Sequence, residues 1–141
     1  MSLEAVRPYF VARLNSVNCT EWPQPFDFTN IPSNLIDRSY QLFIGPVSGV
    51  QTDNDSIEVN VQVSVNVFFK GFREPLLALD EALIKAQEIV VACASFVNQS
   101  GTELKGISFS SLDLDPFDDA LNDNIVRALI IFNCRVFICL D

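Results

Sequence analysis

The 141-residue sequence contains no histidine and few basic residues. Without histidine it cannot form a Ser-His-Asp or Cys-His catalytic group, a histidine-ligated metal site or an imidazole pH switch. Its 9 lysines and arginines are outnumbered by 18 acidic residues, which gives a net charge of −9. This balance argues against wrapping nucleic acid or docking on anionic lipid, because both gain affinity from cationic side chains. We therefore expect no membrane partner.

Glycine-rich loops and long apolar runs are also missing. The five glycines form neither a G-x-G-x-x-G turn nor a phosphate-binding loop followed by Lys-Ser/Thr. The longest uncharged stretches, 39–52 and 89–102, have 14 residues each and include polar residues, whereas a membrane-spanning helix needs about 20 mostly apolar ones. The N-terminus has no signal-peptide pattern. These absences predict a cytosolic protein without a cofactor.

Cysteine is present but lacks the spacing of a reactive or metal-binding site. No pair among the four has the C-x2-C spacing that zinc and redox sites favour; the four are Cys19, Cys93, Cys134 and Cys139. We expect them to be small apolar core residues in a reducing compartment. With no histidine and no such motif, the sequence predicts that the protein is not an enzyme.

Apolar residues are abundant. They make up 49% of the chain and include 12 phenylalanines, while charged residues make up 19%, below the usual quarter of a soluble domain. The length suits a single domain spanning 1–141, and such a domain has limited interior volume. We therefore expect part of the apolar surface to lie between subunits of a self-assembling protein.

The clearest pattern in the sequence is the strict alternation of apolar and polar residues over 57–69. It predicts a half-buried antiparallel strand. At about 3.4 Å per residue the strand would run about 44 Å, against an expected radius of gyration of about 14 Å. We expect part of it to project as one limb of a long β-hairpin arm, whose apolar side then needs a partner.

Helices are predicted over 3–18 and 75–97, where apolar residues recur at steps of three and four. Pro8 would kink the first helix or move its start to a later residue. In the second helix the expected buried stripe is traced by Leu76, Leu79, Leu83, Ala86, Val90, Ala94 and Val97, and Leu77, Ile84 and Val91 widen it.

Further strands are predicted over 37–44 and 104–114, and one last strand or a bent pair of strands over 125–140. The connecting segments are a proline-rich extended connector at 19–36, a polar loop at 45–56 and an acidic connector at 113–124. The order α-β-β-α-β-β predicts an α+β fold with a mainly antiparallel four-stranded sheet and both helices packed on one face.

Two acidic segments are candidate metal or carboxylate-pair sites. Asp53-Asn54-Asp55 with Glu58 resembles a calcium loop but lacks the glycine at its sixth position and the glutamate at its twelfth. The second segment contains Asp113, Asp115, Asp118, Asp119 and Asp123. It has no basic or phosphate-binding partner nearby in sequence, so solvated acidic loops are the simpler interpretation. A small acidic metal-binding or enzymatic α+β domain remains the alternative.

The polar face of the long strand is uncharged: Asn60, Gln62, Ser64 and Asn66. It would either face solvent or line the lumen of a channel, where neutral walls would let a polyanion slide past without releasing counterions. Other residues are candidates for contacts with neighbouring subunits or partners because they are large aromatic residues in a connector, or charged residues in loops and at strand ends. They are Trp22, Phe26, Phe28, Asp53, Asp55, Lys70 and Arg73.

The order of short motifs along the chain carries a resemblance. A helix precedes Phe-Asp-Phe-Thr-Asn-Ile-Pro at 26–32 and Asp-Arg-Ser-Tyr at 37–40, and a long strand and a helix follow. The last strand opens with Ile-Val-Arg-Ala at 125–128 and continues with Phe-Asn-Cys-Arg-Val at 132–136. This arrangement resembles the tail terminator (tail completion) proteins of long-tailed bacteriophages.

The resemblance implies an α+β virion subunit without catalytic residues that forms a ring, by analogy a hexamer. Such a ring caps the tail tube, stops its polymerisation and joins it to the head connector. The implied partners are further copies of the chain, the tail tube protein and the head-tail connector protein, with DNA only passing through the lumen. The implied location is the virion tail, and the host cytoplasm during assembly. Related tube and connector ring subunits share this fold and remain an alternative.

Overall fold

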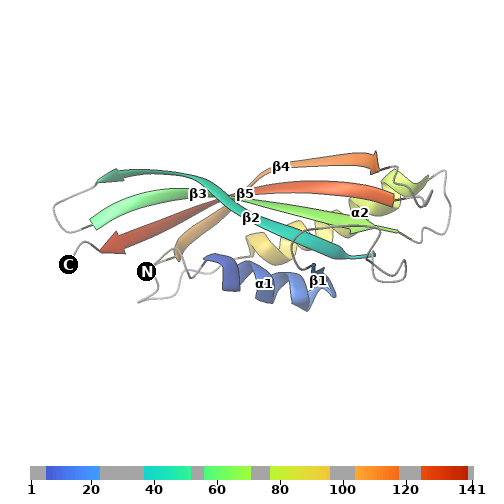
Figure 1. Cartoon of the computed structure of the whole chain (residues 1–141), viewed down its shortest axis with the longest axis horizontal. Coiled ribbons are helices and arrows are strands. Elements are labelled where there is room, and N and C mark those ends of the chain that lie inside the picture. The colour runs from blue at the N-terminus through green and yellow to red at the C-terminus, as the bar shows by residue number, and fades with distance from the viewer. Residues whose placement is uncertain are drawn as a thin grey trace.

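The computed structural model describes residues 6–22, 37–51, 56–70, 77–95, 104–117 and 125–139. Its elements in chain order are α1 (Val6–Ser16), β1 (Thr20–Glu21), β2 (Ser39–Gln51), β3 (Ser56–Phe69), α2 (Ala78–Ala94), β4 (Leu104–Phe117) and β5 (Ile125–Cys139). The strands form one twisted sheet in the order β1-β2-β3-β5-β4, and both helices lie on one face of it (Figure 1).

The α+β class is confirmed, but the expected four-stranded sheet is wrong, because the sheet has five strands and is mixed. β1 pairs with β2 in parallel, while the other three pairings are antiparallel. The backbone amides of Thr20 and Trp22 donate to the carbonyls of Arg38 and Tyr40, each at 2.9 Å. A two-residue strand is too short to show any periodicity, so the sequence pattern indicated only an extended connector here.

The polar loop expected at 45–56 is also wrong, since β2 continues to Gln51 and β3 begins at Ser56. The register between these strands shifts between Ile44 and Val47, around a cis Gly45-Pro46 bond. Gly45 has φ of +127°, a value that other residues rarely adopt. At Gly49 a Cβ atom would lie 3.1 Å from the Glu58 carbonyl oxygen, so close strand approach favours glycine.

β4 likewise extends through Phe117, into the segment expected as an acidic connector from Asp113 onward. Pairing with β5 from Asp113↔Leu129 to Phe117↔Ile125 keeps this segment in the sheet. In both cases the neighbouring strand satisfies the backbone amides and carbonyls, which outweighs the turn-like composition of the segment. Strand limits were therefore the least accurate part of the prediction.

The hydrophobic core lies between the sheet and the two helices. Every second residue of β3 from Val59 to Val67 is at most 4% exposed, and Phe10, Leu14, Ile89 and Phe132 pack into the same cluster at 0% exposure. The helices are joined directly, because the Tyr9 hydroxyl donates to the Cys93 carbonyl oxygen at 2.9 Å. Helix α1 begins at Val6, so Pro8 falls in its first turn, where proline is tolerated.

The expectation that the apolar side of β3 needs a partner is wrong for the part from Val59 onward, because its valines are buried by the chain itself. The expected lone hairpin arm is also corrected. The hairpin end of β2 and β3 does extend past the helices, but β5 and the start of β4 run beside it (Figure 1). The extension is therefore a continuation of the sheet.

The buried face of α2 differs from the expected stripe. Ala82, Ala86, Ile89 and Cys93 face the core, whereas Leu79 and Leu83, which were expected there, are 45% and 39% exposed. Small alanines let the helix approach the sheet closely, so the larger leucines flank the contact. The hydrophobic residues of this helix are spread around its circumference, and periodicity alone does not identify its buried side.

The core cysteines predict a loss of stability in alkali. Burial raises the pKa of Cys19 to about 11 and the pKa of Cys93 and Cys134 to about 12. Unfolded thiols lose their protons near pH 8.5, so between pH 9 and 11 the unfolded state is stabilised while the folded thiols stay protonated. The free energy of unfolding should fall by up to about 1.4 kcal/mol per pH unit for each thiol.

Urea denaturation at pH 7.5, 9.0, 10.0 and 10.5 measures this slope. Cys134→Ala, which removes one buried thiol, should make the decline shallower by up to about 1.4 kcal/mol per pH unit. Burial also raises the pKa of Tyr40, to about 12, so part of the decline at the highest pH persists in the variant. An identical slope in both proteins would contradict the assignment of Cys134 to the core.

Candidate functional site

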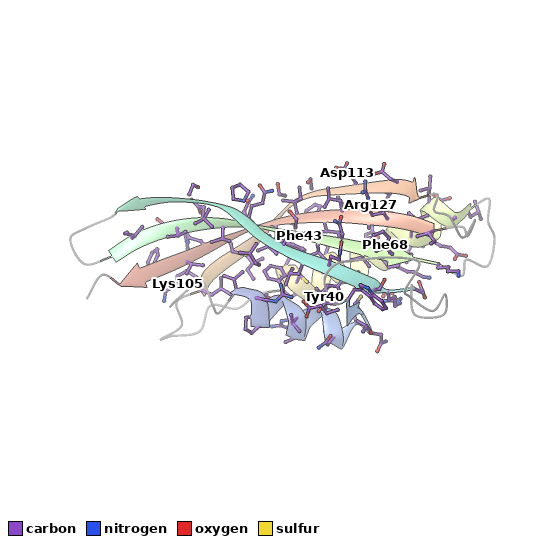
Figure 2. All side chains as sticks on the ribbon, viewed as in Figure 1. Tyr40, Phe43, Phe68, Lys105, Asp113 and Arg127 are labelled. Atoms are coloured by element: carbon purple, nitrogen blue, oxygen red, sulfur yellow. The ribbon has the colours of Figure 1, made fainter. Side chains whose placement is uncertain are left out.

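The face of the sheet opposite the helices carries the predicted polar stripe. Asn60, Gln62, Ser64 and Asn66 alternate with the buried valines of β3, and Asn60 is exposed while the other three are half-buried. Their neighbours on β5 are Asn133 opposite Gln62, Ile131 opposite Ser64 and Leu129 opposite Asn66. The stripe therefore lies in the middle of the sheet on a surface that neither helix covers (Figures 1 and 2).

The arginines of this open face are neutralised by acids on neighbouring strands. Arg127 lies 3.0 Å from Asp115, and Arg135 lies 3.3 Å from Glu58, measured between side-chain nitrogen and carboxylate oxygen. Figure 2 shows Asp113 on β4 at the same surface. Because each cation is matched by a carboxylate, these two positions do not form a track that would bind phosphates strongly.

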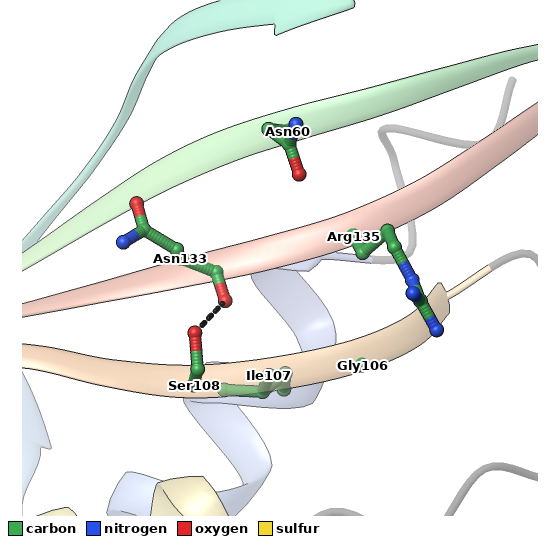
Figure 3. Close-up of a pocket in the computed structure, with 6 residues that line it drawn as sticks. All are labelled: Asn60, Gly106, Ile107, Ser108, Asn133 and Arg135. Carbon is green, nitrogen blue, oxygen red and sulfur yellow. Dashed lines mark hydrogen bonds between the residues drawn. The ribbon is translucent and has the colours of Figure 1, made fainter.

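A shallow pocket lies on the same face, between residues of β3, β4 and β5 (Figure 3). The absence of a side chain at Gly106 leaves space beside Arg135, and the Ser108 hydroxyl donates to the Asn133 carbonyl oxygen at 3.4 Å. The described lining residues are Asn60, Gly106, Ile107, Ser108, Asn133 and Arg135. They include no carboxylate or thiol that could act as a general acid, general base or nucleophile.

The candidate metal segments are only partly described. Glu58 is paired with Arg135, and Asp115 is paired with Arg127. Asp53, Asn54, Asp55, Asp118, Asp119 and Asp123 lie outside the described residues. Within the described ranges, no three His, Cys, Asp or Glu residues are grouped closely enough to hold a metal ion.

Of the predicted contact residues, Trp22 and Lys70 are described. Trp22 is half-buried next to β1, at the β2 edge of the sheet, and Lys70 directly follows β3, where its backbone amide donates to Asp37 Oδ1 at 2.9 Å. The structure thus places these two on the chain's own edge and strand end. Phe26, Phe28, Asp53, Asp55 and Arg73 lie outside the described residues.

One line of apolar residues on α2 was expected to be buried in the core, but it is exposed. Leu77, Ile84 and Val91 are 47%, 61% and 66% exposed and point away from the sheet. They are spaced seven residues apart, so they form one line along α2 on the side opposite Ala82, Ala86, Ile89 and Cys93. The signal was present in the sequence as this seven-residue spacing. We refer to Leu77, Ile84 and Val91 as the outer stripe.

Further exposed apolar residues lie on β2, near the opposite edge of the sheet from β4. Phe43, Ile44 and Val47 are 44%, 39% and 50% exposed, and they flank the register shift around Gly45-Pro46. Figure 2 places Phe43 where β2 crosses the other strands. Phe43 lies opposite Ser64 and so points to the open face, whereas Ile44 and Val47 lie opposite Val63 and Val61 and point to the helix-facing side. We refer to Ile44 and Val47 as the β2 patch. Because α2 packs mainly against β4 and β5, the β2 patch and the outer stripe belong to separate surfaces.

Comparisons with known proteins identify no family. No protein-family model matches the chain, and no curated protein does. Among solved structures, the chain is similar to one from the virion of a native gene transfer agent (GTA) particle, with 17% sequence identity and a TM-score of 0.44. That similarity covers 91% of this chain and 84% of the other. In the described part of the chain, no helix has the length and apolar character needed to cross a membrane.

Proposed function

We propose that this chain is a structural virion subunit that assembles into a ring, of six copies by analogy with tail terminators, at the end of a phage-type tail tube. In this role the ring caps the tube, stops its polymerisation and joins it to the head connector. The proposal assigns no enzymatic activity and no cofactor to the chain. Its partners are further copies, the tube protein and the connector protein, and DNA passes through the lumen.

The observation that carries the proposal is the position of the exposed apolar residues. In the described part of the chain one copy buries its own core, since the valine face of β3 and the inner faces of both helices are buried. The β2 patch and the outer stripe nevertheless remain exposed on separate surfaces. Two different surfaces on one copy suit a head-to-tail contact, which closes into a ring when the rotation divides a full turn.

The open face of the sheet suits the lumen of such a ring. Its central stripe is neutral, and the arginines beside it are paired with carboxylates. A wall of this kind lets DNA pass, because phosphates find few unpaired cations to displace their counterions. The outer edge of β4, and that of β2 beyond its short pairing with β1, would be covered by adjacent copies, which is one way that proteins protect strand edges.

Light scattering and negative-stain electron microscopy test the proposal. The purified protein, alone at high concentration or mixed with tail tubes, should give ring particles with a central hole, and tubes capped by it should stop growing. A monomer that neither assembles nor binds tubes would overturn the proposal. Rings that bind tubes without stopping their growth would instead assign the chain to another tube or connector position.

A further inference from the structure

The two edges of the sheet differ in how far the chain itself covers them. At the β2 edge, β1 pairs with the first two residues of β2, and the Arg7 guanidinium donates to the Leu42 carbonyl oxygen at 3.4 Å. From Ile44 onward, β2 has no strand on its outer side among the described residues, and β4 has none there along its whole length. The described chain therefore presents two open strand edges, and open edges readily pair with another strand.

Exposed apolar side chains mark the same stretch of both edges. Two rows of helix-facing side chains cross the sheet here, each from β2 through β3 and β5 to β4: Ile44, Val63, Phe132 and Phe109 in one row, and Val47, Val61, Cys134 and Ile107 in the other. The inner members are buried, whereas Ile44, Val47 and Phe109 are 39%, 50% and 45% exposed. By contrast, Tyr40 and Leu42, where β1 and Arg7 cover the β2 edge, are at most 4% exposed. The exposed ends of the two rows thus lie where the strand edges are open.

The backbone groups of the end residues Ile44 and Phe109 face outward. Successive residues of a strand direct their N–H and C=O groups alternately to its two sides. On β2 the Tyr40 carbonyl accepts from the amide of the residue that follows β1, so it faces outward, as do the groups of Ile44 four residues later. On β4 the Asn133 carbonyl oxygen accepts from the Ser108 hydroxyl at 3.4 Å, so it points toward β4, and its partner Ser108 directs its backbone groups inward. The next residue, Phe109, therefore directs its own groups away from β5.

The directions of the strands also allow the two edges to pair. The sheet is antiparallel at each step from β2 through β3 and β5 to β4, so β4 runs opposite to β2 (Figure 1). In a ring all copies have the same orientation about the axis, and β4 of one copy therefore meets β2 of the next in the antiparallel sense. The helices of both copies then lie on one side of the joined sheet, and their open faces form one surface. Charge does not oppose the contact, because the described residues of β2 beyond Ile44 are uncharged and Lys105 is the charged residue of β4 up to Phe109.

We infer that the outer edge of β4 in one copy pairs with the open part of β2 in the next copy, with Phe109 beside Ile44 and Ile107 beside Val47. This inference rests on the proposed ring and names the strands that join its subunits. A second copy is the occupant because both rows end exposed on β4 and begin exposed on β2 of the same chain, on the same face and in the order that antiparallel pairing requires. The contact is head-to-tail, so each copy uses both edges.

Cysteine cross-linking tests the contact and its register together. Ile44→Cys and Phe109→Cys are made in separate chains, mixed under reducing conditions so that copies exchange, and then oxidised. Residues that face each other as a hydrogen-bonded antiparallel pair have Cα atoms about 5.5 Å apart, which suits a disulfide. The mixture should therefore give a disulfide-linked dimer on a non-reducing gel. Each variant alone, and the unmodified chain with its native cysteines, should give only background.

The matched control for the cross-link is Phe137→Cys mixed with Ile44→Cys. Phe137 is a 37% exposed phenylalanine on the open face of β5, away from both edges, so this mixture should give no dimer above background. A dimer formed by Ile44→Cys alone or Phe109→Cys alone, in the yield of their mixture, would mean that like edges pair with each other. That result would overturn the inference.

Charged variants test how much the contact contributes to assembly. Val47→Glu on β2 and Phe109→Glu on β4 each place a carboxylate in an apolar row, and each should weaken self-association at least about tenfold. Phe137→Glu should assemble like the unmodified chain. Val47→Glu keeps an intact β4 edge and Phe109→Glu keeps an intact β2 edge, so sedimentation of their mixture should show a 1:1 heterodimer. Circular dichroism verifies that each variant is folded before its assembly is measured.

The unmodified chain separates this inference from the proposed function. If it forms no assembly, alone or on tail tubes, both fail. If it forms rings in which Ile44→Cys and Phe109→Cys do not cross-link, the strand pairing is wrong while the ring stands. If rings of Val47→Glu or Phe109→Glu form normally but no longer bind tubes, the open edges bind a strand of the tube protein, which also overturns the pairing between copies.

Discussion

Replacing Phe132 by alanine should lower the free energy of unfolding by about 3–5 kcal/mol. Phe132 is 0% exposed on the central strand β5, and its ring centroid lies 5.3 Å from that of Phe10 and 6.3 Å from that of Phe109. Helix α1 and two strands therefore meet at this ring, and truncation leaves a cavity that all three must close. Urea denaturation followed by circular dichroism measures the loss, with the slope against urea expected to stay unchanged.

The matched control is Phe137→Ala on the same strand. Phe137 points to the open face and is 37% exposed, and its described ring contact is with the Lys105 ammonium at 6.0 Å. Its truncation should cost less than about 1 kcal/mol, since a weak exposed cation–π contact and little buried area are lost. Equal losses in the two variants would show that the helix-facing side of β5 has been assigned wrongly.

The strongest prediction from the sequence was the strand that became β3. Alternation over 57–69 matches the structure because β3 is paired on both sides, and one of its faces is buried along most of its length. A strand in that position must alternate, since a shift by one residue would expose every valine. The same argument explains why the polar residues Asn60 to Asn66 were correctly placed together on one face.

The strand ends and the short edge strand could not be predicted in the same way. Gly45, Pro46 and Gly49 resemble a loop in composition, but pairing with β3 on both sides of the irregularity at Gly45-Pro46, and at Gly49 itself, keeps this segment in β2. Asp113 and Asp115 belong to β4 because β5 lies beside them. Such pairings join residues that are far apart in sequence, so no local pattern reports them, and β1 has only two residues.

The candidate assembly surfaces were only partly accessible from the sequence. An excess of apolar residues indicated that some would remain outside the core, and the structure locates exposed ones on α2 and β2. Their position could not be deduced, because Leu79, Leu83 and Ile84 look as suitable for burial as Ala82, Ala86 and Ile89. The choice depends on which side of α2 has room against β4 and β5, and small side chains pack closest there.

Val63→Asp should leave the protein largely unfolded. Val63 is 0% exposed in the middle of β3, between Ile44 of β2 and Phe132 of β5. Both neighbours, Ile44 and Phe132, are apolar, so neither can pair with a carboxylate at this position. The carboxylate must therefore lose its charge or open the core to water. A cost above about 4 kcal/mol is comparable to the whole stability of many domains.

The matched control is Gln62→Asp, which introduces the same aspartate side chain one residue earlier in β3. Gln62 lies on the open face opposite Asn133, where water can solvate the carboxylate, so the cost should stay within about 1 kcal/mol. Circular dichroism and thermal melting of both variants measure the contrast. Because only the direction of the side chain differs, a folded Val63→Asp variant, or an unfolded Gln62→Asp variant, would mean that the helix layer covers the other face of the sheet.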